Sequence, residues 1–308
     1  MTGGAPVVEV TLFGLSIGAV FGLLALGLVL IYRTTGILNF AHWAVGLVAV
    51  MAYIGLVGMG VPTPLAAAVS VPLSVVAGVA AYRLVFRRVS RANQIIVILI
   101  TIGVAQLLSS LAAFFLGFQE FTRLAPWLPT GAVRIAGVSM RANELITAAS
   151  AIAFAFGFLV WFRTSTTGRA LRAVAQNREA AMLAGVDDVK YSSIAWGIGS
   201  ALAGVSLLLV LPHVVGEQGG VLTPFDVSPL GTLLIPAFGA ALVGGLVNLP
   251  MALVGGFVFG LARELLILAP KPWSDLRSSI AAILIVLLLL ARTERFFTVR
   301  QEREALEA

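Results

Sequence analysis

The stretch Val10–Tyr32, VTLFGLSIGAVFGLLALGLVLIY, carries no charged side chain over its whole length. A helix needs about 20 mostly apolar residues to cross the hydrocarbon core of a bilayer, so this stretch predicts one membrane span. Its glycines Gly14, Gly18 and Gly22 recur every four residues and share one helix face. Small residues in this spacing let a second helix approach closely in a membrane.

The rest of the chain has the same character. Of its 308 residues, 59% are hydrophobic and only 11% are charged, and the mean hydropathy is +1.03. Soluble domains carry about 25% charged residues. This composition excludes a water-soluble globular enzyme, a disordered chain and a nucleic-acid-binding domain. The chain has no Cys and two His, so we expect no thiolate or histidine-rich metal site.

Further apolar stretches predict additional spans. Gly/Pro-rich breaks near 58–64 and at 248–250 divide the two longest of them. We therefore expect an all-α, polytopic membrane bundle of eight to ten segments, forming a single membrane-embedded domain over 1–308. The predicted segments are 10–32, 36–57, 64–82, 94–117, 144–162, 192–212, 229–247, 251–268 and 277–291.

The distribution of charge predicts the orientation. Most Lys and Arg residues follow the first, third, fifth and ninth segments. Cytoplasmic loops carry an excess of these residues, so we expect the N-terminus outside and the C-terminus in the cytoplasm. Glu264 is the only acidic residue in the interior of a predicted span, since Glu144 stands at the very start of another, and Glu264 adjoins Arg263. We expect both side chains to extend toward the outer membrane surface.

The segment 163–190 is the only long polar interval on the predicted cytoplasmic side. Its alanine-rich sequence favours a helix, with Thr166 or Thr167 as N-cap and Gly185 as the terminating glycine. Apolar and charged side chains fall on separate sides of this helix, which is about four turns long. The helix comprises Gly168, Arg169, Ala170, Leu171, Arg172, Ala173, Val174, Ala175, Gln176, Asn177, Arg178, Glu179, Ala180, Ala181, Met182, Leu183, Ala184 and Gly185.

Two functions are open for this cytoplasmic helix. It could lie on lipid headgroups or dock into a groove of a cytoplasmic protein. The absence of Trp and Phe from it favours docking. The sequence contains no G-x-x-x-x-G-K-[ST] motif, so the chain has no phosphate-binding loop of its own. Any energy from ATP would then come from a partner chain.

Two further sites are candidates for a translocation path. Asn39, Phe40 and His42 follow the first span, and we expect Asn39 and His42 to share a helix face within the membrane, where polar residues usually face the bundle interior. They either line a path or fix packing through hydrogen bonds. The second site is a glycine tract in two predicted half-spans joined by a tight turn, which is typical of transporter pathways and also of close packing. Its residues are Gly244, Gly245, Gly255 and Gly256.

Several motifs together resemble one known family. The run from Gly14 through Tyr32-Arg-Thr-Thr-Gly-Ile-Leu-Asn-Phe-Ala-His42 resembles the opening of LivH-type permeases of branched-chain amino acid ABC importers. The run from Gly168 to Gly185 resembles the permease signature of that family, which contacts the ATPase. Leu202-Ala-Gly204 and the glycine tract resemble its later spans. Trp43 departs from the family, which commonly has Gly there.

This resemblance implies a non-catalytic permease subunit in a bacterial inner membrane. It implies two ABC ATPase subunits bound at 168–185, a second LivM-like permease (or a second copy of this chain) and an extracytoplasmic substrate-binding protein. No cofactor is expected on this chain, because ATP-Mg belongs to the ATPases. The implied substrates are branched-chain or related hydrophobic amino acids, with urea or short amides as an alternative. An ion-coupled secondary transporter acting alone is the competing class.

Overall fold

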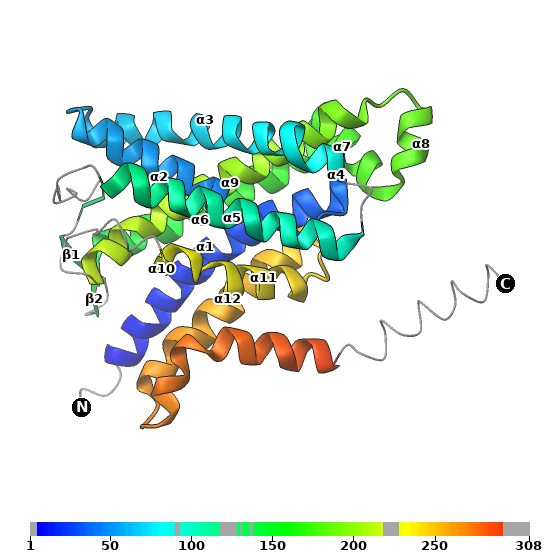
Figure 1. Ribbon diagram of the computed structural model, residues 1–308. Helices are drawn as coiled ribbons and strands as arrows, with labels where there is room; N and C mark the ends of the chain where they lie inside the picture. The colour runs from blue at the N-terminus through cyan, green and yellow to red at the C-terminus, as the bar shows by residue number, and fades with distance from the viewer. Residues whose placement is uncertain are drawn as a thin grey trace.

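The computed structural model describes residues 5–89, 93–117, 128–129, 131–135, 138–217 and 228–291. Figure 1 shows them as one bundle of helices. In chain order the elements are α1 (Ala5–Thr35), α2 (His42–Gly58), α3 (Thr63–Ala81), the π-helical η1 (Tyr82–Phe86), α4 (Arg87–Val89), α5 (Gln94–Gly117), β1 (Ala132–Ile135), β2 (Val138–Arg141), α6 (Ala142–Thr164), α7 (Thr166–Gln176), α8 (Arg178–Leu183), α9 (Asp188–Glu217), α10 (Ser228–Gly231), α11 (Leu234–Val243), α12 (Leu249–Leu265), the 3₁₀ turns η2 (Leu266–Leu268) and η3 (Trp273–Ser278), and a last helix, Ile280–Ala291.

The helices confirm an all-α membrane bundle. Within the described residues, six helical stretches are long and apolar enough to cross a membrane: Val7–Thr35, Thr63–Val89, Gln94–Phe115, Ala142–Thr164, Asp188–Val214 and Leu249–Leu268. The shorter apolar helices α2, α11 and Ile280–Ala291 correspond to the other three predicted segments. One difference is the antiparallel ribbon of β1 and β2, which pairs Ala132 with Arg141 and Ile135 with Val138. The sequence analysis did not expect these strands.

Helix α1 is the centre of the bundle. It is apolar on all sides, and a helix of this kind is buried or spans a membrane. In the structure it is buried along most of its length and packs against α12, α9, α6 and α11. Helix α9 is the second central element, because it also packs against α2 and α3. By contrast α5 lies at the periphery and exposes one side along its length.

The glycine face of α1 meets the glycine face of α12. A Cβ atom built on Gly18 would lie 2.8 Å from the Cα of Phe257, and one on Gly256 would overlap the backbone of Gly22 and Gly18. Gly260 packs in the same way against Gly14 and Gly18. The predicted close packing is therefore present, and the two backbones touch at what we call the glycine contact.

The expectation for Glu264 was wrong. Its side chain is fully buried and does not extend to the membrane surface. Arg277, which lies in η3, donates a hydrogen bond from Nη2 to its Oε2 at 2.6 Å, and Arg263 Nη1 lies 3.5 Å from its Oε1. The chain turns back after η2, so that Arg277 reaches the carboxylate. A buried carboxylate needs such partners because desolvation of an unpaired charge is costly.

Candidate functional site

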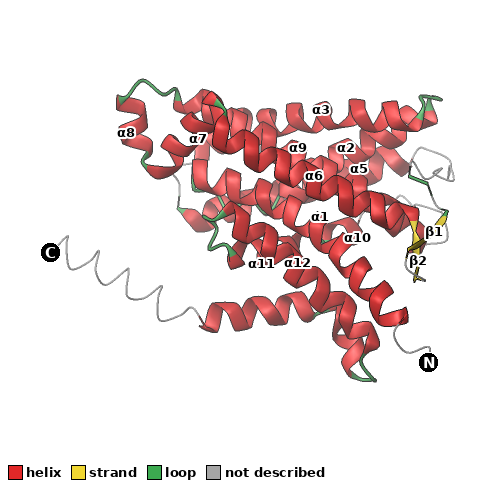
Figure 2. Ribbon diagram, turned by 180° about the vertical axis from the view of Figure 1, so that it is seen from behind, coloured by secondary structure: helices red, strands yellow, loops and turns green. Residues whose placement is uncertain are grey.

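Helices α7 and α8 lie at one end of the bundle, opposite the β1–β2 ribbon, in both views (Figures 1 and 2). The single helix expected over 168–185 was wrong, because the chain breaks between α7 and α8 at Asn177. This residue has an extended backbone with φ −153°, and its Oδ1 accepts a hydrogen bond from the amide of Ala180. Asn177 thus caps a new helix instead of continuing the first, as short polar side chains commonly do.

The base of α7 is fixed to the end of α6. Ser165, rather than Thr166 or Thr167, is the N-cap, and its Oγ accepts a hydrogen bond from the amide of Gly168 at 2.9 Å. Gly168 lies against the backbone of Phe162, where a Cβ atom would overlap. Leu171 and Val174 are buried. The inner face of α7 is therefore seated on the bundle.

Three arginines gather beside this base. Arg33, Arg163 and Arg172 line a small pocket of about 300 Å³, together with residues of the turn before α12. Arg172 donates a hydrogen bond from Nη1 to the carbonyl of Phe162, and the guanidinium groups of Arg33 and Arg172 lie 6.0 and 5.6 Å from the centroid of the Phe162 ring. Among the described residues no ion pair joins any of the three to a carboxylate. Arg172 is thus part of how α7 is held.

Helix α8 is tied to the start of α9. Arg178 donates a hydrogen bond to Asp188 at 2.5 Å, and this bond raises the pKa of the Arg178 guanidinium above its ordinary value. Gly185 has φ +84°, a conformation that glycine adopts readily, and its amide bonds to the carbonyl of Met182. The prediction that Gly185 ends the helix is confirmed.

The outer surface of α7 and α8 faces solvent. The side chain of Leu183 is 91% exposed and that of Met182 is 46% exposed. Among the predicted site residues, the buried ones are Gly168, Leu171, Val174 and Ala181; the exposed ones are Arg169, Gln176, Asn177, Glu179, Ala180, Met182, Leu183, Ala184 and Gly185; the remainder are half-buried. An apolar tip surrounded by polar residues is typical of a surface that binds another protein.

The segment between α1 and α2 is not helical, which corrects the expectation that Asn39 and His42 share a helix face. Gly36 has φ +71°, and α2 begins only at His42. Asn39 and His42 are both buried, and His42 Nε2 lies 3.2 Å from the carbonyl of Leu24 in the middle of α1. The chain therefore turns back into the bundle before α2 starts.

This unwound segment, residues 36–41, is held from two sides. Asn39 Oδ1 accepts a hydrogen bond from the amide of Ala41, and the amide of Phe40 donates one to Thr101 Oγ1 of α5 at 3.3 Å. The ring of Phe40 lies 5.5 Å from that of Phe238 in α11. Sequence reasoning missed Thr101 and Phe238, because both contacts join parts of the chain that are far apart.

The glycine tract lies in a turn and in helix contacts. Gly245 has φ +62° in the turn between α11 and α12, and Asn248 caps α12. Gly255 packs against Ala240 of α11, and Gly256 belongs to the glycine contact. The predicted packing of the two segments across a tight turn is confirmed, but the second is not a half-span, because Leu249–Leu268 is long enough to cross a membrane. The atoms nearest to a Cβ built on Gly244, Gly255 or Gly256 belong to α1, α11, α12 and the turn between α11 and α12.

The described residues contain no group of three or more His, Asp or Glu side chains that could hold a metal ion.

The chain is similar in sequence to known membrane transport proteins. Residues 10–291 match the family model described as branched-chain amino acid transport system / permease component. The high-affinity branched-chain amino acid permease protein LivH of Escherichia coli K12 is 29% identical over 82% of this chain and 83% of its own length. BraD of Pseudomonas aeruginosa is 29% identical over 81% and 83%. A solved inward-facing ABC transporter, assigned to the metal-chelate type, is 16% identical with a TM-score of 0.47, covering 92% of this chain and 85% of that one.

Proposed function

Because the chain belongs to the permease family of branched-chain amino acid transport systems, we propose that it moves branched-chain or related hydrophobic amino acids into the cell. It is a multi-pass inner-membrane transport subunit of an ABC transporter rather than a catalyst. Its relatives LivH and BraD are named for branched-chain amino acid transport, which favours these substrates over urea or short amides. One membrane domain, 1–308, would carry the coupling segment 163–190, with the N-terminus outside and the C-terminus in the cytoplasm.

The observation that carries the proposal is the surface of α7 and α8. This pair of helices is anchored on its inner side by Leu171, Val174 and the bond between Arg178 and Asp188. It exposes Met182 and Leu183 at its tip. Helices that are anchored to the bundle on one side and expose an apolar tip on the other suit a docking surface for a partner protein. We infer that residues 168–185 dock onto two ATPase subunits, which bind and hydrolyse ATP-Mg.

A second permease, LivM-like or a copy of this chain, would pack against α5. This helix is the most exposed of the long apolar helices. Its outer face carries the polar residues Gln106 and Ser110, together with Gly103, in the middle of a mostly apolar span, and all three are exposed. Polar side chains at this depth are more favourably placed against protein than against lipid tails. A substrate-binding protein would act at the opposite end from α8.

The unwound segment is the better of the two candidate path sites. Broken helices at membrane depth are tolerated where the backbone is buried in protein or lines a cavity. Phe40 and Trp43 are half-buried and lie between α5 and the α10–α11 region, next to Phe238 and Gly231. Asn39 and His42 would hold this segment in shape. Gly244, Gly245, Gly255 and Gly256 would act as packing and turn residues of the path wall.

A co-purification and uptake experiment tests the docking surface. Leu183→Asp places a charge on the exposed tip, and we expect it to prevent retention of the ATPase and to abolish ATP-driven uptake while the protein still inserts. Met59→Asp is the matched control, since Met59 is 80% exposed at the end of α2, far along the chain from α8. We expect it to retain the ATPase.

Two results would contradict the proposal. The first is wild-type ATPase retention and uptake in Leu183→Asp. The second is amino acid uptake by the purified chain alone in liposomes under an ion gradient, which would indicate a secondary transporter.

A further inference from the structure

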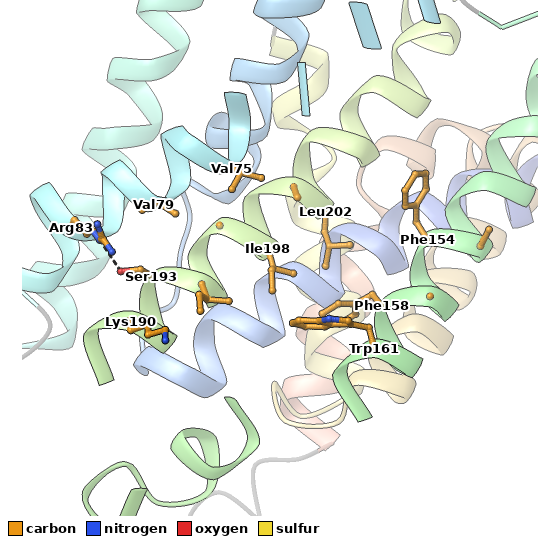
Figure 3. Close-up of a pocket in the computed structure, with 15 residues that line it drawn as sticks. Val75, Val79, Arg83, Phe154, Phe158, Trp161, Lys190, Ser193, Ile198 and Leu202 are labelled. Carbon is orange, nitrogen blue, oxygen red and sulfur yellow. Dashed lines mark hydrogen bonds between the residues drawn. The ribbon is translucent and has the colours of Figure 1, made fainter. Parts of the chain in front are cut away.

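An open groove of about 850 Å³ runs along the side of the bundle between α3, α6 and α9 (Figure 3). Helix α9 forms its floor, and α3 with η1 on one side and α6 on the other form its walls. Its lining is almost entirely apolar, with side chains such as Val79, Phe158 and Ile198. Among the described residues that line it, Arg83 and Lys190 carry the only two charges, and Figure 3 shows both at the same end.

Small residues keep the groove open. Helix α6 contributes Ala153 and Gly157, and α9 contributes Gly197 and Ala201. A Cβ atom on Gly157 would meet no other atom within 4 Å, so the space beside this residue is unfilled by the protein. Gly157 thus leaves an open space beside α6, whereas the glycines of α1 and α12 allow two helices to pack closely.

The groove follows half the length of the candidate membrane spans. On each of its three helices the lining residues run from the middle of the span to the end near α7: Val75 to Arg83, Ala153 to Trp161, and Lys190 to Leu202. The last interval rises by roughly 18 Å at 1.5 Å per residue. Half of the hydrocarbon core is about 15 Å thick. The groove therefore has the depth of one leaflet, which is too short for a spanning helix of a partner.

The charged end has an excess of positive charge. Arg83 Nε donates a hydrogen bond to Ser193 Oγ at 3.1 Å, and Lys190 Nζ lies 5.7 Å from the ring centroid of Tyr191. Of the nearby carboxylates, Asp188 is engaged by Arg178, and Asp187 accepts a bond from the Lys190 amide. Among the described residues no ion pair neutralises Arg83 or Lys190. Basic pockets between membrane helices are typical sites for anionic lipid headgroups.

We propose that this groove binds an anionic phospholipid of the cytoplasmic leaflet, with an acyl chain between α3 and α6 and the headgroup phosphate at Arg83 and Lys190. The lipid covers the apolar floor of α9 and supplies the negative charge that the protein lacks there. It also contacts α9 close to Asp188, where α8 is tied. Binding is a property of this chain alone, so it can be tested whether or not the proposed transport function holds.

Fluorescence quenching by brominated lipids tests the site, because Trp161 lines the groove. The chain is reconstituted in nanodiscs with brominated phosphatidylglycerol or brominated phosphatidylcholine, and the Trp161 signal is the difference between wild type and Trp161→Phe. We expect phosphatidylglycerol to quench Trp161 at a lower mole fraction than phosphatidylcholine. The double variant Arg83→Gln with Lys190→Gln should weaken this preference on the order of tenfold.

Arg88→Gln is the matched control. Arg88 is an exposed cation at the same end, and it does not line the groove. It should keep the wild-type preference, and all variants should elute as monodisperse peaks. Equal quenching by both lipids in wild type, or an unchanged preference in the double variant, would overturn the proposal.

A cross-linking arm tests for protein in the groove. The chain contains no cysteine, so Ala201→Cys introduces a single thiol at the floor. We expect reaction with a lipid-soluble maleimide and no cross-link to another chain. Cross-linking of residue 201 to a second permease would show that protein occupies the groove and would overturn the lipid assignment.

Discussion

The glycine contact and the α7–α8 pair are both rich in small residues, yet they have opposite roles in the structure. In the glycine contact, Gly18, Gly22 and Gly256 have no space for a Cβ atom, and two helix backbones touch. In α8, Ala180 faces solvent, as does Ala184 directly after it. Close packing in the first region fixes the centre of the bundle, whereas the small residues of the second leave an open surface.

The difference shows that composition alone does not distinguish a close helix contact from a surface open to solvent. Membrane helices associate through close van der Waals packing, because lipid provides no hydrophobic drive between them. The α7–α8 pair lies at the end of the bundle and is secured only along its inner side. Variants in the first region should therefore affect folding, and variants in the second should affect coupling at little cost in stability.

The largest expected effect comes from filling the glycine contact. Gly256→Leu would push α12 away from α1, since even a Cβ atom overlaps the backbone of Gly22. Overpacking of this kind costs about 3 kcal/mol or more when the backbone cannot move. We expect little monodisperse protein in fluorescence-detected size-exclusion chromatography.

Gly55→Leu is the control for this substitution. Gly55 is also helical, in α2, but a Cβ atom there meets nothing within 4 Å. It should elute as wild type does. Equal yields of the two variants would mean that the contact between α1 and α12 does not support the fold.

A smaller effect is expected at the buried carboxylate. Arg277→Ala removes the 2.6 Å partner of Glu264, which is fully buried, and should lower the stability by about 3 kcal/mol. Arg263→Ala removes a partner at 3.5 Å and should cost less. The measurement is the thermal melting temperature of each purified variant. A larger loss in Arg263→Ala would mean that Arg277 is not the principal counter-ion.

Periodic features of the structure were predictable from sequence, and long-range ones were not. The spacing of Gly14, Gly18 and Gly22 indicated a packing face, because four residues bring side chains back to the same side of a helix. It did not indicate that α12 would be the partner. Glu264 was misjudged for the same reason: its counter-ion, Arg277, follows a turn whose geometry the sequence does not encode locally.

The candidate site was predictable in position but not in shape. The polarity of 163–190 and the glycine at 185 located the polar segment of α7 and α8 and its end. The break at Asn177 was missed because the alanines on both sides favour a continuous helix, although Asn is a good N-cap. The groove beside α9 could not be predicted, since it depends on how three helices diverge.

The smallest expected effect on stability is at this break. Asn177→Ala removes the cap of α8 and favours fusion of α7 and α8 into one helix, which would redirect Leu183. We expect a loss of about 1 kcal/mol, measured as a small fall in melting temperature. ATPase retention should fall far more than stability does, because the docking surface changes direction.

Gln176→Ala separates this capping effect from any change at the exposed end of α7. Gln176 is the adjacent exposed residue and ends α7, while the bond from the Ala180 amide belongs to Asn177. Hydrogen–deuterium exchange over 177–185 should change in Asn177→Ala and stay near wild type in Gln176→Ala. If both variants exchange alike and both retain the ATPase, the cap at Asn177 does not set the direction of α8. In that case the packing of α7 against Phe162 is enough to position the docking surface.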